Sequence, residues 1–312
     1  QPPAWPCPCW RTERSRGARR RAAARPAATM QRTRPFTTQR LYGMGFIAIV
    51  LTLILSIHCT YVFTIYGPKL WRLDAAIFLF FYHLLFMGLL ASFYQCVMID
   101  PGLVPPNWGF YMGDETKRRR YCKMCNVWKP DRTHHCSICN RCILNMDHHC
   151  PWINNCVGFY NRKFFFQLLG YVYFTLVVSV GFTIPELFER FMRLIEPKSL
   201  DHVNKTWYCI SSAIIGMAFC MSMLLLCTLT NFIRFHMKLI VENYTTIENL
   251  EREEGAKSKF DIGWRRNWEQ VFGSNAWLWW LPMHTQASRP IGDGVRWRVH
   301  YTRVIDEDEE AS

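Results

Sequence analysis

The sequence predicts an α-helical polytopic membrane protein with four transmembrane helices and a cytosolic, metal-organised domain between the second and third helices. Three observations lead to this prediction. Four apolar stretches, at 42–66, 75–99, 164–185 and 207–233, each reach the ~20 residues that a spanning helix needs. Seven of the 14 cysteines and four of the 10 histidines lie between Cys122 and Cys156. The 37 Lys and Arg residues are distributed unevenly around the apolar stretches.

The distribution of basic residues predicts the orientation of the helices. Lys and Arg number 10 before the first stretch, 10 between the second and third, and 11 after the fourth. Only 2 lie between the first and second stretches and 4 between the third and fourth. Because basic residues favour the cytosolic side, both termini and the cysteine-rich region are expected in the cytosol. That compartment is reducing, so the cysteines should bind metal or react instead of forming disulfides.

Residues 1–41 form a basic N-terminal segment, of which residues 1–29 are rich in Arg, Ala and Pro. We expect Met30 to be the initiator, and the alternative is a basic arm that binds anionic lipid. No secretory signal peptide is predicted, because the first apolar run is too long and no cleavage site follows it.

The connections between the spans are short or have clear turn signals. Tyr66-Gly67-Pro68 predicts a tight hairpin between the first two helices, and Asp100-Pro101-Gly102 ends the second. Residues 186–206 are expected to form a luminal loop. It contains a glycosylation sequon at Asn204, which lies too close to the fourth span for easy modification.

The cysteine-rich region, within 100–163, has the ligand spacing of metal sites. Three short pairs, Cys122-x2-Cys125, Cys136-x2-Cys139 and Cys139-x2-Cys142, have the spacing with which one turn holds a tetrahedral zinc ion. The region lacks apolar periodicity, so metal is expected to organise it. Two closed sites of three cysteines and one histidine each would leave one cysteine and two histidines over. A free cysteine beside a free histidine is a candidate catalytic pair.

Order and spacing are intact along one run of motifs: Cys122-x2-Cys125, Lys129-Pro130-x-Arg132, His135-Cys136-x2-Cys139-x2-Cys142, Asp147-His148-His149-Cys150-Pro151-Trp152 and Asn155-Cys156-x-Gly158. This run resembles the cysteine-rich domain of the DHHC protein S-acyltransferases, the palmitoyltransferases of eukaryotic membranes. Asp100-Pro101-Gly102 is similar to a further family motif, as is Thr245-Thr246-x-Glu248, which also reads as a helix capping box. Asn267 corresponds to the asparagine of the family's C-terminal motif.

The resemblance implies two structural zinc ions, one held by Cys122, Cys125, His135 and Cys142 and the other by Cys136, Cys139, His149 and Cys156. It implies that Cys150 is the nucleophile that carries an S-palmitoyl intermediate, with His148 as its base and Asp147 orienting His148. Thr246 is implied to reach the Asp147 region. Spacing alone does not choose among Cys142, Cys150 and Cys156 as the free thiol.

The implied reaction moves a long-chain acyl group, mainly palmitoyl, from fatty acyl-CoA to cysteines of substrate proteins in two ping-pong steps. Arg162 and Lys163 are expected to contact the phosphates of CoA. The acyl chain is expected in a cavity of the helix bundle, with Trp152 as a contact near Cys150. Half a hydrocarbon core, roughly 15 Å, corresponds to about ten helical residues, which puts the floor near Phe174 or Thr175. The alternative for Thr175 is a hydrogen bond within its own helix.

The C-terminal region, 234–312, is expected in the cytosol. One apolar helical face is formed by Trp264, Trp268, Val271 and Phe272, with Trp277, Trp279 and Trp280 following. This pattern predicts an interfacial helix and not a span. The expected partners are acyl-CoA, substrate proteins with membrane-proximal cysteines and the lipid bilayer, without nucleic acid. The expected location is the endomembrane system, in the Golgi, endoplasmic reticulum or plasma membrane.

The same residues argue against other classes of function. A nucleic-acid-binding zinc finger is disfavoured because no His-x3–5-His pair follows Cys125 on a recognition helix. A transporter is disfavoured because the apolar stretches contain no Asp, Glu, Lys or Arg in their interiors. The remaining alternative is a catalytically inactive membrane scaffold with the same zinc domain. The sequence favours the enzyme, since Asp147, His148 and Cys150 are all present.

Overall fold

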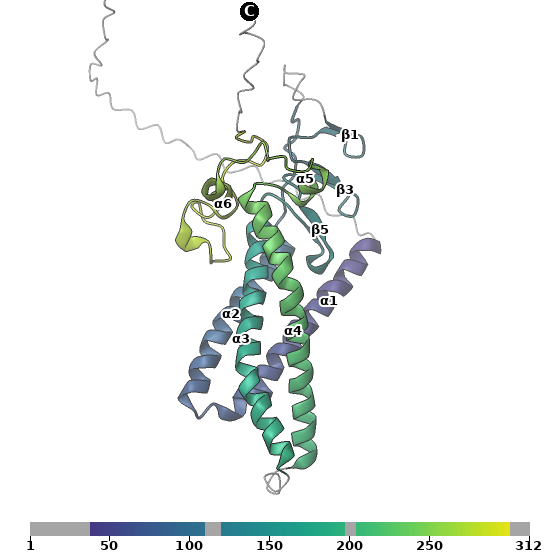
Figure 1. Cartoon of the computed structure of the whole chain (residues 1–312). Helices are drawn as coiled ribbons and strands as arrows, with labels where there is room; N and C mark the ends of the chain where they lie inside the picture. Colours follow the sequence, from purple (N-terminus) through teal and green to yellow (C-terminus); the bar gives the residue numbers. More distant parts are fainter. Residues whose placement is uncertain (1–37, 110–119, 197–203, 300–312) are drawn as a thin grey trace, which may run out of the picture. The chain divides into compact units, whose positions relative to one another are not determined.

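The computed structural model describes residues 38–109, 120–196 and 204–299 (Figure 1). Its main elements are four helices: α1 (Thr38–Cys59), α2 (Leu73–Met98), α3 (Arg162–Ile195) and α4 (Lys205–Val241). A π-helical turn, η1 (Thr60–Tyr66), and a 3-10 turn, η2 (Gly67–Lys69), extend α1. Four helical stretches within these ranges are long and apolar enough to cross a membrane: Leu41–Lys69, Leu73–Met98, Arg162–Ile195 and Lys205–Val241. The predicted helical membrane fold is confirmed, while Met30 and the residues around it lie outside the described ranges.

The third helix is longer than the sequence indicated. Pro185 lies inside α3, which continues to Ile195, so residues 186–195 of the predicted luminal loop are helical. Ion pairs at i,i+4 spacing support the extension, since Glu186 accepts a bond from Arg190 at 2.8 Å. Lys69 also pairs with Glu186 and joins η2 to α3. At the start of α4, the Asn204 side chain accepts a hydrogen bond from the backbone N–H of Trp207 at 3.1 Å and caps the helix.

The cysteine-rich region consists of three antiparallel hairpins between α2 and α3. They pair β1 (Tyr121–Cys122) with β2 (Val127–Trp128), β3 (His134–Cys136) with β4 (Arg141–Ile143), and β5 (His148–Cys150) with β6 (Asn155–Val157). A 3-10 turn, η4 (Pro151–Ile153), joins the last two strands. Strands of two or three residues bury little apolar surface, so hairpins of this size need an additional source of stability.

The third hairpin packs directly on the helix bundle. Cys150, Ile153 and Val157 belong to one buried apolar cluster with side chains of α2 and α3: Leu89, Phe93, Cys96, Phe164, Phe165, Leu168 and Leu169. The Asn155 side-chain amide donates to the carbonyls of Cys96 and Ile99, both at 3.0 Å, and so bonds the free carbonyls at the end of α2. The strand that contains Cys150 is thereby fixed at one end of the bundle.

The Asp100-Pro101-Gly102 motif is more than a helix stop. The Asp100 carboxylate accepts a bond from the Gly102 backbone N–H at 2.9 Å and pairs with Arg141 of β4. Gly102 has a φ of 121°, which favours glycine, and its carbonyl accepts a bond from the N–H of Leu144. The motif therefore fastens the end of α2 to the cysteine-rich region.

The C-terminal region folds over the same end of the bundle as α5 (Thr246–Glu251), α6 (Trp264–Phe272) and a 3-10 turn, η6 (Ala276–Leu278) (Figure 1). The α6 helix forms as predicted, but its apolar face does not serve mainly as a membrane contact. Val271 and Phe272 are buried against Ile240 of α4 and Phe166 of α3, and only Trp264 of the predicted face stays largely exposed. The neighbouring helices supply the apolar surface that the sequence had led us to expect from lipid.

Candidate active site and metal centres

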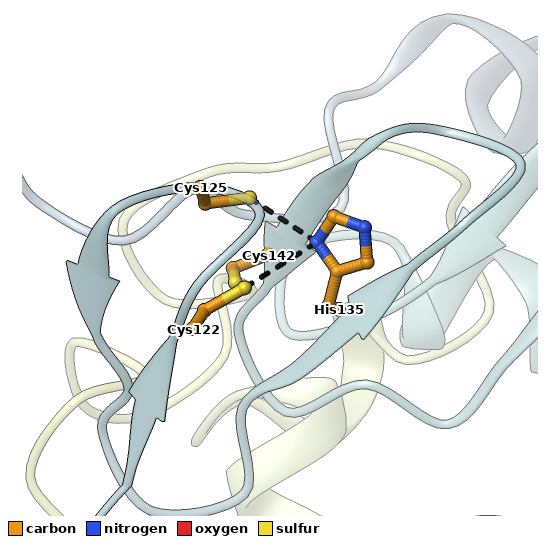
Figure 2. A group of neighbouring side chains, drawn as sticks. All are labelled: Cys122, Cys125, His135 and Cys142. Atoms are coloured by element: carbon orange, nitrogen blue, oxygen red, sulfur yellow. Dashed lines mark hydrogen bonds between the residues drawn. The ribbon is translucent and has the colours of Figure 1, made fainter.

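The first Cys/His cluster joins the β1–β2 and β3–β4 hairpins. Its members are Cys122, Cys125, His135 and Cys142, whose ligand atoms all lie within 4.8 Å of one another. Figure 2 shows the three sulfurs gathered at one edge of the imidazole. The sulfurs of Cys122 and Cys125 lie 3.6 and 3.1 Å from Nδ1 of His135.

The second cluster consists of Cys136, Cys139, His149 and Cys156 and joins the β3–β4 and β5–β6 hairpins. Its three sulfurs lie 3.7, 3.5 and 3.6 Å from Nδ1 of His149. With metal–sulfur bonds of about 2.3 Å and metal–nitrogen bonds of about 2.0 Å, a tetrahedral ion separates its ligand atoms by about 3.5–3.8 Å. The second cluster fits such an ion, and the first has the same donor set with one sulfur–nitrogen distance, 3.1 Å, shorter than this range. Both clusters have the members that the family resemblance implied.

Strand alternation explains how the two clusters leave Cys150 free. Successive side chains of a strand point to opposite faces. In β5, His149 points to the second metal cluster, while His148 and Cys150 occupy the opposite face. Cys150 is buried in the apolar cluster with α2 and α3, and the His148 side chain is 25% exposed.

Asp147 is fully buried and is held by groups from four parts of the chain. Its carboxylate accepts bonds from Nδ1 of His148 at 2.7 Å and from the N–H and hydroxyl of Thr246 at 3.0 and 2.8 Å. Arg162 of α3 lies 3.3 Å away, and Nδ1 of His236 of α4 lies 4.0 Å away. Burial would raise the pKa of this carboxyl, but the charge of Arg162 and the bond from His148 hold the pKa well below its usual range.

His148 receives opposing influences. Burial lowers the pKa of an imidazole, but bonds with Asp147 and Cys150 raise the pKa of His148 to about 9. Because Nδ1 faces Asp147, the other ring nitrogen is left for the Cys150 thiol. The Phe165 ring lies edge-on at 5.1 Å between centroids and limits rotation of the imidazole. The arrangement can take a proton from a thiol and stabilise the resulting imidazolium.

Comparison with known proteins agrees with this geometry. The DHHC palmitoyltransferase family model matches residues 115–253. The probable protein S-acyltransferase 14 of Arabidopsis thaliana is 34% identical over 276 residues, which cover 79% of this chain and 87% of that protein. The chain belongs to the DHHC palmitoyltransferase family. Probable protein S-acyltransferase 12 of the same plant is 33% identical over 68% of this chain and 75% of its own length. Palmitoyltransferase pfa3 of Schizosaccharomyces pombe is 37% identical over 61% of this chain and 55% of its own length.

The family's Thr-Thr-x-Glu motif joins the C-terminal region to the site in this chain. Thr245 and Glu248 form a complete capping box at the start of α5, as the sequence predicted. This cap places Thr246 against Asp147. Asn267 of the C-terminal motif is also buried, where it donates to the carbonyl of Val241 at 2.7 Å and accepts from the N–H of Ile262 at 3.0 Å. It holds α6 against the end of α4.

One further residue of the site, His236, was not singled out from the sequence, and Arg132 was named there only as part of a motif. His236 lies in the part of α4 beyond the predicted end of the fourth span, and its ring is 5.8 Å from that of His148. Arg132 is buried, donates to both carboxylate oxygens of Glu248, and lies between the rings of Phe260 and Trp297. The Lys129-Pro130-x-Arg132 motif was the available signal for Arg132, but it did not predict these partners.

The structure argues against the prediction that Arg162 and Lys163 bind the phosphates of CoA. Arg162 is buried, pairs with Asp147 and donates to the carbonyl of Tyr244 at 2.7 Å. Lys163 has no exposed surface, and its amine donates to the carbonyls of Leu278 and Met283, both at 3.1 Å. Both cations have internal partners, and they present little or no surface to a ligand.

Trp152 and Thr175 were expected to contact the acyl chain, and the structure gives their exposure and neighbours. The Trp152 side chain, two residues after Cys150, is 52% exposed, and its ring lies 5.2 Å from that of Phe46 of α1. Thr175 points into the bundle, with 6% of its surface exposed, while Phe174 points outward with 47% exposed. The Thr175 hydroxyl finds no hydrogen-bond partner among the residues that the structure describes, contrary to the alternative of a bond within its own helix.

Proposed function

We infer from family membership and from the geometry around Cys150 that the protein is a protein-cysteine S-acyltransferase. We propose that it transfers a long-chain fatty acyl group, mainly palmitoyl, from acyl-CoA to cysteine thiols of substrate proteins. The position of Cys150 carries the proposal. Among the seven cysteines between 122 and 156 it alone lies outside both metal clusters, and it shares a strand face with His148. Apolar side chains of α2 and α3 surround it.

In the first step, the Cys150 thiol gives its proton to His148 and the thiolate attacks the thioester carbonyl of acyl-CoA. The carbon–sulfur bond to CoA breaks, an acyl thioester forms on Cys150, and the CoA thiolate leaves with a proton from the imidazolium. Asp147 keeps the imidazole in one orientation and stabilises its charge, supported by Thr246. Arg162 balances the charge of Asp147 in its buried setting.

In the second step, a substrate thiol loses its proton to His148 and attacks the acyl-Cys150 carbonyl. The acyl group moves to the substrate and the Cys150 thiolate is regenerated, which makes the reaction ping-pong. One thioester replaces another, so little free energy is consumed. Cys150 lies beside the first turn of α3, which supports substrates whose cysteines lie close to the membrane surface.

The two metal clusters are proposed to hold structural zinc. Three cysteines and one histidine per site form a closed tetrahedral donor set, which leaves no ligand position for substrate. Bound zinc would contribute folding free energy to hairpins that are too small to stabilise themselves. The second cluster would fix His149, and through it the strand that presents His148 and Cys150.

A pocket of about 650 Å³ replaces Arg162 and Lys163 as the candidate site for the phosphates of CoA. It lies between the cysteine-rich region and the segment after α5. Five Arg and Lys side chains line it against three Asp and Glu: Arg120, Arg132, Arg252, Lys257 and Lys259, with Asp131, Glu248 and Glu251. This excess of positive charge favours a phosphorylated head group.

The acyl chain is proposed to run from Cys150 into the helix bundle, past Trp152 and toward Thr175. Support comes from the inward orientation of Thr175 and from its hydroxyl, which lacks a partner within the described ranges. A small residue there would leave room for long chains. The distribution of basic residues supports a cytosolic position for the cysteine-rich region. The membrane is proposed to be one of the endomembrane system.

The decisive experiment is mass spectrometry of the purified protein after exposure to palmitoyl-CoA. We expect a palmitoyl mass on the peptide that contains Cys150, and loss of that mass after treatment with neutral hydroxylamine, which cleaves thioesters. An unmodified Cys150, with both metals bound and the donor intact, would favour the inactive membrane scaffold instead.

A further inference from the structure

The loop that follows α6 is apolar along its whole length. Residues 276–283 read Ala-Trp-Leu-Trp-Trp-Leu-Pro-Met and contain no charged side chain. Trp277 is 87% exposed and Trp280 is 66% exposed, and Leu281 and Met283 are also exposed. Exposing such a surface to water would cost free energy. Contiguous exposed apolar side chains of this kind therefore mark an interaction site.

Helix side chains bond the carbonyl groups along most of this loop. Six consecutive carbonyls, from residue 278 to residue 283, accept bonds from Lys163, Gln167 and Tyr171 of α3 and from Gln95 of α2. Gln167 donates to the carbonyls of Trp279 and Leu281 at 2.7 and 2.9 Å, and the Tyr171 hydroxyl donates to that of Trp280 at 2.6 Å. The three α3 residues are spaced by four and therefore lie along one helix face.

The N–H groups of the loop are also largely used within it. The N–H of Leu278 bonds the carbonyl of Asn275, that of Trp279 bonds Ala276, and that of Leu281 bonds Leu278. The N–H of Met283 bonds the carbonyl of Leu281, and Pro282 has none to offer. Irregular backbone is tolerated at membrane depth only where its polar groups are satisfied by protein. This loop meets that requirement. A solvated loop would not need it, because water would bond its backbone groups.

The level of the loop along α3 places it within the membrane boundary. Residues 164–185 contain no charged side chain and, at about 1.5 Å per residue, span about 33 Å, close to the ~30 Å hydrocarbon core. Tyr171 lies seven residues into this stretch, about 10 Å from its start. Its side chain leans back toward the helix N-terminus, so the bonded carbonyl lies roughly 5–10 Å deep. Tryptophan is enriched at the membrane–water interface that borders this depth.

We propose that residues 276–283 form a membrane-inserted loop, which enters the leaflet on the side of the cysteine-rich region and contacts lipid through Trp277, Trp280, Leu281 and Met283. The loop beside α6 in Figure 1 lies against the α2 and α3 ends that donate to it. Insertion does not depend on the acyltransferase chemistry. It narrows the interfacial role, which the sequence predicted for α6 together with Trp277, Trp279 and Trp280, to the loop after α6.

The test is photo-crosslinking of the full-length protein in phosphatidylcholine nanodiscs, with benzoylphenylalanine at one position at a time. Trp280 and Trp277 are the test positions. Phe81 is 60% exposed on α2 and serves as the lipid-facing reference, and Leu250 is 78% exposed on α5 and serves as the reference outside the membrane. We expect lipid adducts at 280 and 277 at a yield similar to that at 81 and several-fold above that at 250.

A second set of variants tests the role of the helix donors. Gln167→Leu removes two of the bonds to the loop and should lower lipid adducts at position 280 several-fold. Gln286→Leu changes an exposed glutamine outside these contacts and should leave the adducts unchanged. Both variants should retain their metal content. Adducts at 280 no higher than at 250, or adducts to a second protein chain in place of lipid, would overturn the proposal.

Discussion

Two strands of the cysteine-rich region have the same sequence and different chemistry. Both β3 (134–136) and β5 (148–150) read His-His-Cys, and in both the middle histidine is paired in register with a cysteine, Cys142 or Cys156. In β3 the middle histidine serves the first metal cluster and the cysteine serves the second. In β5 the middle histidine serves the second cluster, and the cysteine serves neither.

The surroundings of the two strands explain the difference. Cys136 faces Cys139, His149 and Cys156, which complete a metal site around it. Cys150 faces the apolar ends of α2 and α3, and its register partner, Asn155, turns its amide toward the carbonyls of α2. The residue before β5 is Asp147, whereas the residue before β3 is Thr133. A tripeptide thus becomes a metal ligand pair or a reactive site according to what packs on each face.

The largest expected difference is between the two cysteines at the third position. Cys150→Ser should abolish self-acylation and transfer while both metals stay bound, because its sulfur lies outside both clusters. Cys136→Ser should lose the metal of the second cluster and part of the fold. Metal analysis, circular dichroism and acylation by mass spectrometry measure these outcomes. Loss of a metal from Cys150→Ser would make Cys150 a ligand and refute the mechanism.

The middle histidines should behave alike. His135→Ala and His149→Ala each remove one ligand, and structural zinc contributes about 10–16 kcal/mol of apparent binding free energy in small domains. We expect each variant to bind about one metal fewer and to unfold at a lower temperature, as followed by metal analysis and thermal denaturation. His149→Ala should also lose acylation, because its strand carries Cys150. Unchanged metal content in either variant would contradict the ligand assignment.

The first histidines should differ again. His148→Ala should keep both metals and the fold but slow acyl-enzyme formation by about 10²–10⁴-fold, the usual contribution of a positioned base. His134 lines the pocket proposed for CoA phosphates, so His134→Ala should act mainly on the KM for acyl-CoA. Single-turnover acylation over a range of donor concentrations separates the two effects. If both variants lost the same acylation rate at saturating acyl-CoA, the separate roles of His148 and His134 would be refuted.

Much of this site could be predicted from the sequence, because its ligands lie within 35 positions of chain and resemble a family pattern. Spacing alone left Cys142, Cys150 and Cys156 open, since the choice depends on strand faces that the sequence does not show. Arg162 and Lys163 were predicted to bind a ligand because their burial could not be foreseen. The backbone carbonyls that bond them lie more than 80 residues away in the sequence. Pro185 suggested a helix end, but it removes only one backbone donor, and the ion pairs beyond it sustain the helix.

Asp147 directly precedes β5, whereas no carboxylate directly precedes β3, and Thr246 donates hydrogen bonds to Asp147. Thr246→Val removes the hydroxyl bond to Asp147 and keeps the backbone bond, so acyl-enzyme formation should slow roughly tenfold with little change in stability. Thr245→Val is the matched control, because it removes the cap of α5 and should cost about 1 kcal/mol of stability. Rapid-quench acylation and thermal denaturation measure the two. A rate loss confined to Thr245→Val would mean that Thr246 has no part in orienting Asp147.

The smallest expected effect concerns the proposed acyl path that leads from Cys150 into the helix bundle. Cys136 has no such path, because it belongs to the second metal cluster. If Cys150 delivers an acyl chain into the bundle, the inward-facing Thr175 lies near the end of that path, about ten residues along the third span. A phenylalanine there would fill the space that a long chain needs. Thr175→Phe should therefore shift the preferred acyl-CoA toward shorter chains, with total activity on those chains and metal content unchanged.

A chain-length series of acyl-CoA donors on wild type and variant provides the measurement. Phe174→Trp is the control, because it also adds an aromatic volume, in this case to the neighbouring residue, whose side chain points outward and is 47% exposed. It should leave the length profile as it is, since lipid and not the cavity would receive the added volume. An unchanged profile in Thr175→Phe would place the acyl chain elsewhere. Equal shifts in both variants would indicate a general distortion of α3. If Thr175 lines the acyl cavity, only the substitution at this inward-facing position should change the preferred chain length.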